Sequence, residues 1–206
     1  MKKILIVAAL AMVSVASYAQ VSWNVKAGMN ISTFINDEEA DAKVGYSLGV
    51  GMEYRFNPLF SIQPSLLFTT KGASGKASLA NIKVTPKYLE LPIMAAFRFA
   101  VGNEQNIVVK AGPYLAYGIG GKYSVTVNGI NLSFPIFKDT SLGTDYGNMD
   151  VPAAERFDFG LGLGVDYEIK HFFIGLNGEF GLTKLYSLDP NSSKNMNFTI
   201  GVGYKF

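Results

Sequence analysis

Residue types that usually carry catalysis are scarce in this sequence. His171 is the only histidine, and it follows Lys170 in a short segment between two apolar stretches. A Ser-His-Asp triad or an Asp-His site needs a histidine that acts as base beside its nucleophile or water. A histidine in a short turn does not fit that role, so we expect no catalytic residue and no enzyme activity.

Cofactor and metal motifs are equally weak. The run Gly160-Leu161-Gly162-Leu163-Gly164 lacks the spacing of a dinucleotide-binding loop, and no helical pattern follows it. The acidic stretch 36–41 lacks the regular oxygen-ligand spacing of a calcium loop, which favours a solvated loop. The chain has no Cys to form a disulfide or to bind a metal as thiolate. We therefore expect no cofactor and no metal.

The N-terminal sequence indicates export. Residues 1–19 have the layout of a cleavable signal peptide. They begin with Lys2 and Lys3, continue with an apolar run from Ile4 to Val15 and end in a small-x-small site at Ala19. About twelve apolar residues are too few for a spanning helix, which needs roughly 20. Without the two leader lysines the 18 basic residues fall to 16, equal to the 16 acidic residues, so nothing favours binding to nucleic acid. The expected mature domain covers residues 20–206.

Period-two alternation dominates the mature chain. Between Val44 and Phe56 every even position is apolar, while the odd positions carry small or charged residues. Such alternation predicts a β-strand with one apolar and one small-polar face. The same pattern predicts eight strands, at about 21–34, 44–56, 59–71, 87–100, 107–119, 157–169, 172–181 and 196–206.

Connector lengths predict the topology. Short connectors at 57–58, 101–106 and 170–171 alternate with longer segments at about 35–43, 72–86, 120–156 and 183–195. Strands of about 13 residues tilted by about 40° reach roughly 33 Å, enough for the apolar band of an outer membrane. The prediction is an all-β fold, an eight-stranded antiparallel transmembrane β-barrel with short periplasmic turns and long extracellular loops. The alternative, a soluble lipocalin-like barrel, would have to pack the aromatic residues of the apolar faces into a narrow lumen.

Several segments resemble the PorT-like family of small outer-membrane β-barrel proteins of Gram-negative bacteria. They are Tyr88-Leu89-Glu90-Leu91-Pro92, Gly112-Pro113-Tyr114, Arg156-Phe157-Asp158-Phe159-Gly160 and the ending Gly201-Val202-Gly203-Tyr204-Lys205-Phe206. The resemblance covers essentially the whole mature chain and implies a barrel known by its architecture rather than by an activity, with some members tied to protein secretion. The last strand also resembles the C-terminal signal that barrel-assembly machinery recognises. That machinery and the outer-membrane lipids are therefore expected partners.

Charged residues on the small-polar faces predict a polar lumen. The candidates for a charge network are Glu53, Glu90, Arg98, Lys110, Asp166 and Glu179. An unpaired ion in a low-dielectric interior costs several kcal/mol, so we expect the two bases of this set to pair with its acids. A structural plug is favoured over an ion or proton path, because eight strands leave an interior that side chains fill.

The segment 120–156 is the expected site of a surface function, because it is too long for a simple connector. Asn128-Gly129 between two alternating runs is a strong signal for a tight type I′ hairpin. An apolar ribbon of this kind should pack on neighbouring loops or on a partner protein. Residues 138–155 are expected to be irregular. The candidate binding residues are Val125, Val127, Asn128, Gly129, Ile130, Leu132 and Phe134.

These patterns favour a non-enzymatic integral outer-membrane protein. Its role would be structural, or it would bind an envelope or surface partner through residues 120–156. The alternative is a narrow, porin-like channel for small solutes. The two differ in whether the lumen is open, which single-channel conductance in planar bilayers separates.

Overall fold

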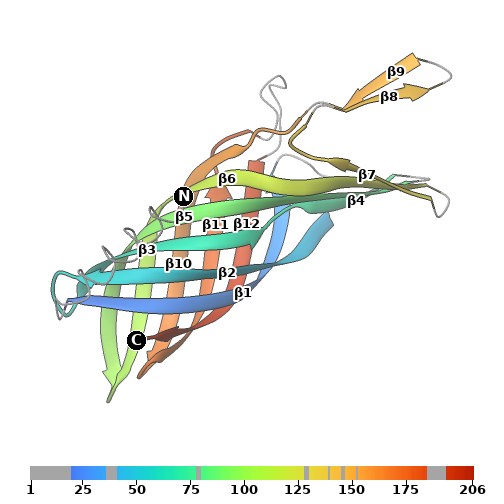
Figure 1. The fold of residues 1–206 in the computed structure, drawn as a ribbon. Coiled ribbons are helices and arrows are strands. Elements are labelled where there is room, and N and C mark those ends of the chain that lie inside the picture. Colours follow the sequence, from blue (N-terminus) through green and yellow to red (C-terminus); the bar gives the residue numbers. More distant parts are fainter. Residues whose placement is uncertain are drawn as a thin grey trace.

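Strands form almost all of the fold in the computed structural model of the chain (Figure 1). The structure describes residues 20–35, 41–77, 80–127, 130–138, 140–144, 147–151, 153–184 and 194–206. The predicted signal peptide, residues 1–19, and the predicted turn residues Asn128 and Gly129 lie outside this part of the chain. Among the residues the structure describes, no helix is long and apolar enough to cross a membrane.

Eight antiparallel strands close into a barrel. Each strand pairs with the next, and the last pairs with the first to close the ring. The predicted eight-stranded antiparallel barrel is therefore confirmed. In ring order the strands are β1 (Val21–Ile35), β2 (Asp41–Arg55), β3 (Phe60–Thr70), β5 (Ala80–Gly102), β6 (Gln105–Val127), β10 (Phe157–Ile169), β11 (Phe172–Gly181) and β12 (Lys194–Lys205).

Both ends of the barrel domain lie with the short turns. The connections between β2 and β3, β5 and β6, and β10 and β11 cover only 56–59, 103–104 and 170–171. The Arg55 N–H donates to the Gln20 carbonyl at 2.9 Å, and the Phe206 N–H donates to the Trp23 carbonyl at 2.8 Å. These bonds hold residues 20 and 206 at the end of the barrel that carries the short periplasmic turns.

The outer wall of the barrel is apolar and the inner wall is polar. On β10, Leu161, Leu163 and Val165 face outward, with 57% of Leu163 exposed, whereas Asp158 and Asp166 face inward and are buried. A continuous belt of exposed aliphatic and aromatic side chains is stable against lipid and unfavourable in water. The orientation confirms the membrane-spanning barrel over the lipocalin-like alternative.

The extracellular end is more ordered than the sequence predicts. Residues 72–86, expected to be a loop, contain β4 (Ala73–Ala77) and the first part of β5, and β6 continues beyond the predicted strand end at 119. Residues 80–87 of β5 pair with 120–127 of β6. Pro86 and Gly120-Gly121 interrupt the alternation, and a register shift beside Lys87 absorbs the irregularity. The strands therefore resume where the sequence pattern is broken.

Two hairpins rise from the extracellular end. β7 (Ile130–Pro135) pairs with β6, with Val127 opposite Ile130, so the predicted strand pair forms. Together β4, β5, β6 and β7 make a four-stranded sheet beyond the barrel rim (Figure 1). The expectation of irregular structure over 138–155 is wrong, because β8 (Thr140–Thr144) and β9 (Gly147–Val151) form a second hairpin. Strands of five residues are too short for an alternating pattern to stand out.

Candidate functional site

The histidine of this chain is held at the periplasmic end. Its Nδ1 lies 3.0 Å from the Lys205 carbonyl oxygen, and the His171 ring stacks on Tyr204 at a centroid distance of 5.6 Å. Within the described ranges, no group of three or more His, Cys, Asp or Glu side chains is placed to hold a metal ion. The fold gathers its polar groups in the lumen instead.

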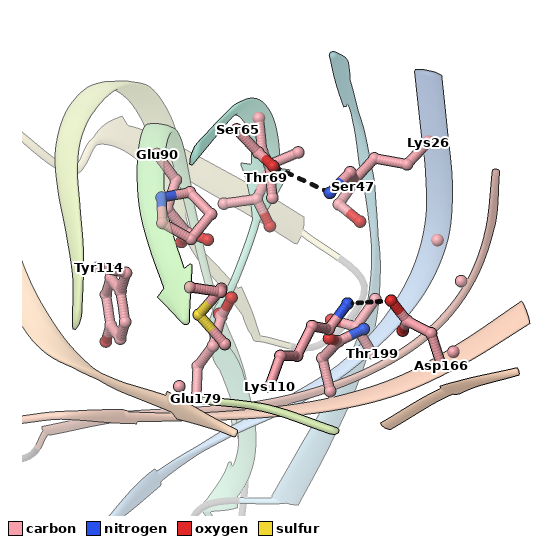
Figure 2. Close-up of a pocket in the computed structure, with 18 of the residues that line it drawn as sticks. Lys26, Ser47, Ser65, Thr69, Glu90, Lys110, Tyr114, Asp166, Glu179 and Thr199 are labelled. Carbon is pink, nitrogen blue, oxygen red and sulfur yellow. Dashed lines mark hydrogen bonds and ion pairs between the residues drawn. The ribbon is translucent and has the colours of Figure 1, made fainter. Parts of the chain in front are cut away.

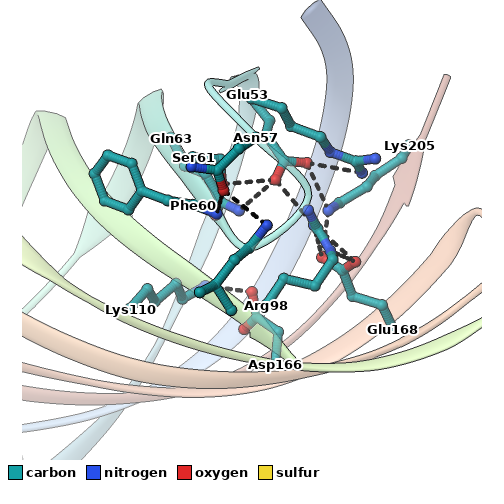
Figure 3. A network of polar contacts seen from close by, with 12 residues as sticks. Glu53, Asn57, Phe60, Ser61, Gln63, Arg98, Lys110, Asp166, Glu168 and Lys205 are labelled. Atoms are coloured by element: carbon teal, nitrogen blue, oxygen red, sulfur yellow. Dashed lines mark hydrogen bonds and ion pairs between the residues drawn. The ribbon is translucent and has the colours of Figure 1, made fainter. Parts of the chain in front are cut away.

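Four buried charged residues, Glu53, Arg98, Glu168 and Lys205, form the Arg98 network near the periplasmic end (Figure 3). Arg98 Nη2 lies 2.9 Å from Glu53 Oε1 and 2.9 Å from Glu168 Oε2. Lys205 Nζ lies 3.0 Å from Glu53 Oε2 and also contacts Glu168. The four residues come from β2, β5, β10 and β12, which are alternate strands of the ring. The network therefore ties the barrel walls together across the lumen rather than along one strand pair.

A second group, the Lys71 cluster, lies closer to the extracellular end and consists of Lys71, Glu90, Asp158 and Glu179. Lys71 Nζ lies 2.7 Å from Glu90 Oε2, 3.3 Å from Glu179 Oε2 and 3.7 Å from Asp158 Oδ2. All four are in the lumen, and Lys71 also sits 4.2 Å from the centre of the Tyr114 ring. The Lys71 ammonium thus forms ion pairs with three carboxylates, and Lys71 is the residue that holds this cluster together.

A small cavity lies between the two groups (Figure 2). Glu90 and Glu179 line one part of it, and Gln63, which donates to Glu53 of the Arg98 network at 3.2 Å, lines another. The volume open to the centre of a water-sized sphere is about 70 Å³. Lys110 and Asp166 also line the cavity and form an ion pair of 2.5 Å. The lumen is therefore filled at both ends and has only a small space in the middle.

The six residues predicted for the charge network all face the lumen. The structure brings Arg98 to Glu53 and Lys110 to Asp166. It places Glu90 and Glu179 beside Lys71, a further base on the small-polar faces, rather than beside Arg98 or Lys110 as predicted. Pairing across a barrel depends on how the strands are staggered, so the sequence pattern shows which face a residue occupies but not its partner.

Sequence reasoning also missed Lys26, which lines the same cavity from β1. Its Nζ donates to Ser65 Oγ on β3 at 2.9 Å. The signal was present, because Lys26 stands between the outward-facing Val25 and Ala27, and the strand period places it on the lumen face.

Aromatic and aliphatic side chains cap the extracellular end of the lumen. Ile136 and Phe137, which follow β7, are buried against Tyr88 and the other core residues of this end. Arg156 fastens the segment, donating from Nη1 to the Gly118 carbonyl at 2.9 Å and from Nη2 to the Phe137 carbonyl at 3.1 Å. The return of the chain from β7 toward β10 thus folds over the barrel mouth.

The predicted binding hairpin lies on the sheet beyond the rim. Leu132 is 50% exposed, whereas Val125 opposite it and Phe134 are partly buried. The hydroxyls of Ser124 and Ser133 lie 2.9 Å apart across the two strands. In the part of the chain that the structure describes, β7 has a neighbouring strand on one edge only. The hairpin therefore presents a free strand edge and an exposed leucine to the exterior.

Comparison with known proteins identifies the family. A family model for the outer membrane protein beta-barrel domain matches residues 16–187. The chain belongs to this family. Family and fold together make it an integral protein of the outer membrane, in contact with membrane lipids. No curated protein sequence matches this outer-membrane β-barrel protein.

One solved structure has the same fold as this chain, and two others were found to be similar to it. Ail, the attachment invasion locus protein of Yersinia pestis, is 17% identical over 91% of this chain and 99% of Ail, with a TM-score of 0.50. OprG of Pseudomonas aeruginosa is 13% identical over 91% of this chain and 96% of OprG, with a TM-score of 0.47. Neisserial surface protein A is 16% identical over 90% of this chain and 99% of that chain, with a TM-score of 0.46. Identities this low bear on the fold and not on the activity.

Proposed function

We propose that this chain is a non-enzymatic outer-membrane protein that binds an envelope or surface protein through its extracellular sheet. The observation that carries the proposal is the length of β5 and β6. Each has 23 residues, whereas β10, the next strand of the ring after β6, has 13. The added length does not cross the membrane but builds the sheet of β4, β5, β6 and β7. A rigid scaffold that holds strands away from the membrane is typical of a binding surface.

The hairpin at the tip of this sheet is the part best suited to bind a protein. On its outer edge β7 pairs with no other described strand, so an extended segment of a partner can bind its backbone donors and acceptors as an added strand. The exposed Leu132 supplies an apolar contact beside that edge. A part in an envelope complex also agrees with the PorT-like resemblance, whose members include proteins tied to secretion.

The lumen gives less support to the alternative, a narrow channel. A channel needs a continuous water path, and here the Arg98 network and the Lys71 cluster fill the lumen on either side of a cavity of about 70 Å³. Ile136 and Phe137 add an apolar cap at the extracellular mouth. These features favour a plugged barrel that serves as an anchor for the surface sheet.

Site-specific photo-cross-linking in intact cells tests the proposal. A photoreactive amino acid replaces Leu132 on the hairpin or, as a matched control, Leu163 on the lipid-facing wall; both side chains are about half exposed. We expect a discrete protein adduct from position 132 and none from position 163. Folded protein with no adduct at position 132 would contradict the proposal.

A hairpin-shortened variant makes the test specific. Tyr123 and Phe134 lie directly opposite each other in the β6–β7 ladder, so residues 124–133 can be replaced by a two-residue Asn-Gly turn that joins them. The barrel should still fold and migrate as a heat-modifiable species. Adducts formed by the photoreactive residue placed at Phe134 of the full-length chain should disappear in the shortened chain.

A further inference from the structure

The outward face of β5 changes from apolar to basic where the strand leaves the barrel. Leu89 and Leu91 are 42% and 40% exposed on the lipid-facing wall. The same alternation continues through Lys87 and Lys83, which are both exposed. Tyr117, directly opposite Leu89 on β6, is exposed as well, and a tyrosine at the end of an apolar band is typical of the membrane interface. Lys87 therefore lies at the level of the lipid headgroups of the outer leaflet.

Thr85 is at the centre of a group of four lysines. Lys83 and Lys87 stand two residues before and two residues after it on the same face of β5. Lys122, which is exposed, lies directly opposite Thr85 on β6. Lys43 reaches the same residue from β2, because its Nζ donates a hydrogen bond to the Thr85 hydroxyl. We call Lys43, Lys83, Lys87 and Lys122 the rim lysines.

The rim lysines outnumber the acids on their face. Among the described residues, no carboxylate oxygen lies within ion-pair distance of any of the four ammonium groups. The strand register places one acid, Asp41, on this face, where Ser74 of β4 separates it from Lys83. Thr85 accepts the hydrogen bond from Lys43, which leaves its own O–H as a donor. The face therefore offers a concentration of positive charge and a hydroxyl donor to an anionic group.

We propose that the rim lysines bind the phosphate groups of an outer-leaflet lipid, a phosphorylated glycolipid of the lipid A type. A lysine ammonium binds phosphate as a point charge with three donors, so it does not require one fixed geometry. Several ammonium groups on one face match a headgroup that carries more than one phosphate. The exposed apolar side chains of Leu89 and Leu91 lie directly below and fit the acyl chains of the same lipid. The bound lipid fastens the base of the extracellular sheet to the membrane surface.

Native mass spectrometry of the purified barrel in detergent micelles measures the binding directly. The probes are bis-phosphorylated lipid A and the same lipid A after removal of its phosphates. We expect a saturable adduct with the phosphorylated lipid and binding of the dephosphorylated lipid that is weaker by about tenfold or more. Inorganic phosphate at the same concentration should not compete, because it has no acyl chains. Equal binding of the two lipids, or displacement of the lipid by inorganic phosphate, would overturn the proposal.

Two double variants with the same change of charge separate the rim lysines from lysines elsewhere. Lys87→Gln/Lys122→Gln removes two rim lysines. The control, Lys170→Gln/Lys184→Gln, removes one exposed lysine from a periplasmic turn and another that follows β11. We expect the rim variant to bind phosphorylated lipid A about tenfold more weakly and the control to bind it as the wild type does. Lys87→Arg/Lys122→Arg should retain binding, because it keeps both charges. Equal weakening in the rim variant and the control would contradict the site.

The acidic stretch 36–41 of the same chain is the competing partner for the rim lysines. Three of its acids, Asp37, Glu38 and Glu39, lie outside the described residues. Replacing them by Asn, Gln and Gln should leave the affinity for phosphorylated lipid A within about twofold of the wild type, since the proposed occupant is the lipid. A gain of about tenfold or more would show that this stretch occupies the rim lysines and would overturn the proposal.

Urea unfolding in phosphatidylcholine vesicles supplies an independent readout. Phosphorylated lipid A added to the vesicles should raise the urea midpoint of the wild type and of Lys170→Gln/Lys184→Gln, because it binds the folded barrel. The rise should be lost in Lys87→Gln/Lys122→Gln. A rise that persists in this rim variant would show that the lipid acts elsewhere on the barrel.

Discussion

Arg98 and Arg55 both contact Glu53. Replacing each by Met compares how much a buried and an exposed arginine contribute to the stability of the barrel. Arg98 holds Glu53 and Glu168 at 2.9 Å, and 8% of its side chain is exposed. Arg55 lies 3.3 Å from Glu53, and 44% of its side chain is exposed. Breaking a buried ion pair typically costs about 3–5 kcal/mol because the partner is left uncompensated, whereas an exposed pair contributes about 0–1 kcal/mol.

We therefore expect Arg98→Met to lower the free energy of unfolding by about 3–5 kcal/mol and Arg55→Met by about 1 kcal/mol or less. Lys205 remains beside both carboxylates and keeps the Arg98→Met loss toward the lower end of that range. Urea unfolding in phospholipid vesicles, followed by the fluorescence of Trp23, the single tryptophan, measures both values. Equal losses for the two variants, or a loss below about 1 kcal/mol for Arg98→Met, would refute the argument that the network ties the walls together.

Three further predictions, which need five variants, test the wall and the lumen by the same unfolding assay. Leu163→Arg puts a charge on the lipid-facing wall and should cost about 2–4 kcal/mol, and a neutral result would mean that the strand faces are reversed. Gly160→Ala should lower the free energy of unfolding much more than Gly162→Ala does. The new Cβ would lie 2.2 Å from the Phe180 carbonyl oxygen at position 160, but 3.2 Å from the flexible end of the Met94 side chain at position 162. Lys71→Met should destabilise the barrel more than Glu90→Gln does. The first substitution leaves three carboxylates without their cation, whereas the second removes one of the three negative charges. The reverse order of stabilities would show that Lys71 does not hold the cluster together.

The sequence predicts the barrel wall well, because successive side chains of a strand point alternately to the lipid and to the lumen. In β10 the alternation of Leu161 and Leu163 with glycines predicts both the strand and its outward face. Long apolar strands separated by short turns leave little freedom in the order of pairing. The spanning part of the fold follows from these two facts.

The extracellular sheet and the lumen contacts were harder to predict for physical reasons. Pro86 and Gly121 lie opposite each other where β5 and β6 leave the barrel. They interrupt the alternating pattern, so the sequence does not show that both strands continue. Within the lumen, Glu53 meets Arg98 from 45 residues away and Lys205 from 152 residues away. Such pairings are set by strand stagger and barrel closure, which no local pattern encodes.

Single-channel recording in planar lipid bilayers tests the closed lumen most directly. The purified barrel is inserted at low protein density, and the wild type is compared with Glu90→Gln, whose side chain belongs to the Lys71 cluster and lines the cavity. We expect no stable unitary conductance from the wild type, and no ion-selective conductance from the variant. A stable unitary conductance in the wild type, with an ion selectivity that Glu90→Gln alters, would contradict the plugged barrel and establish the lumen as a channel.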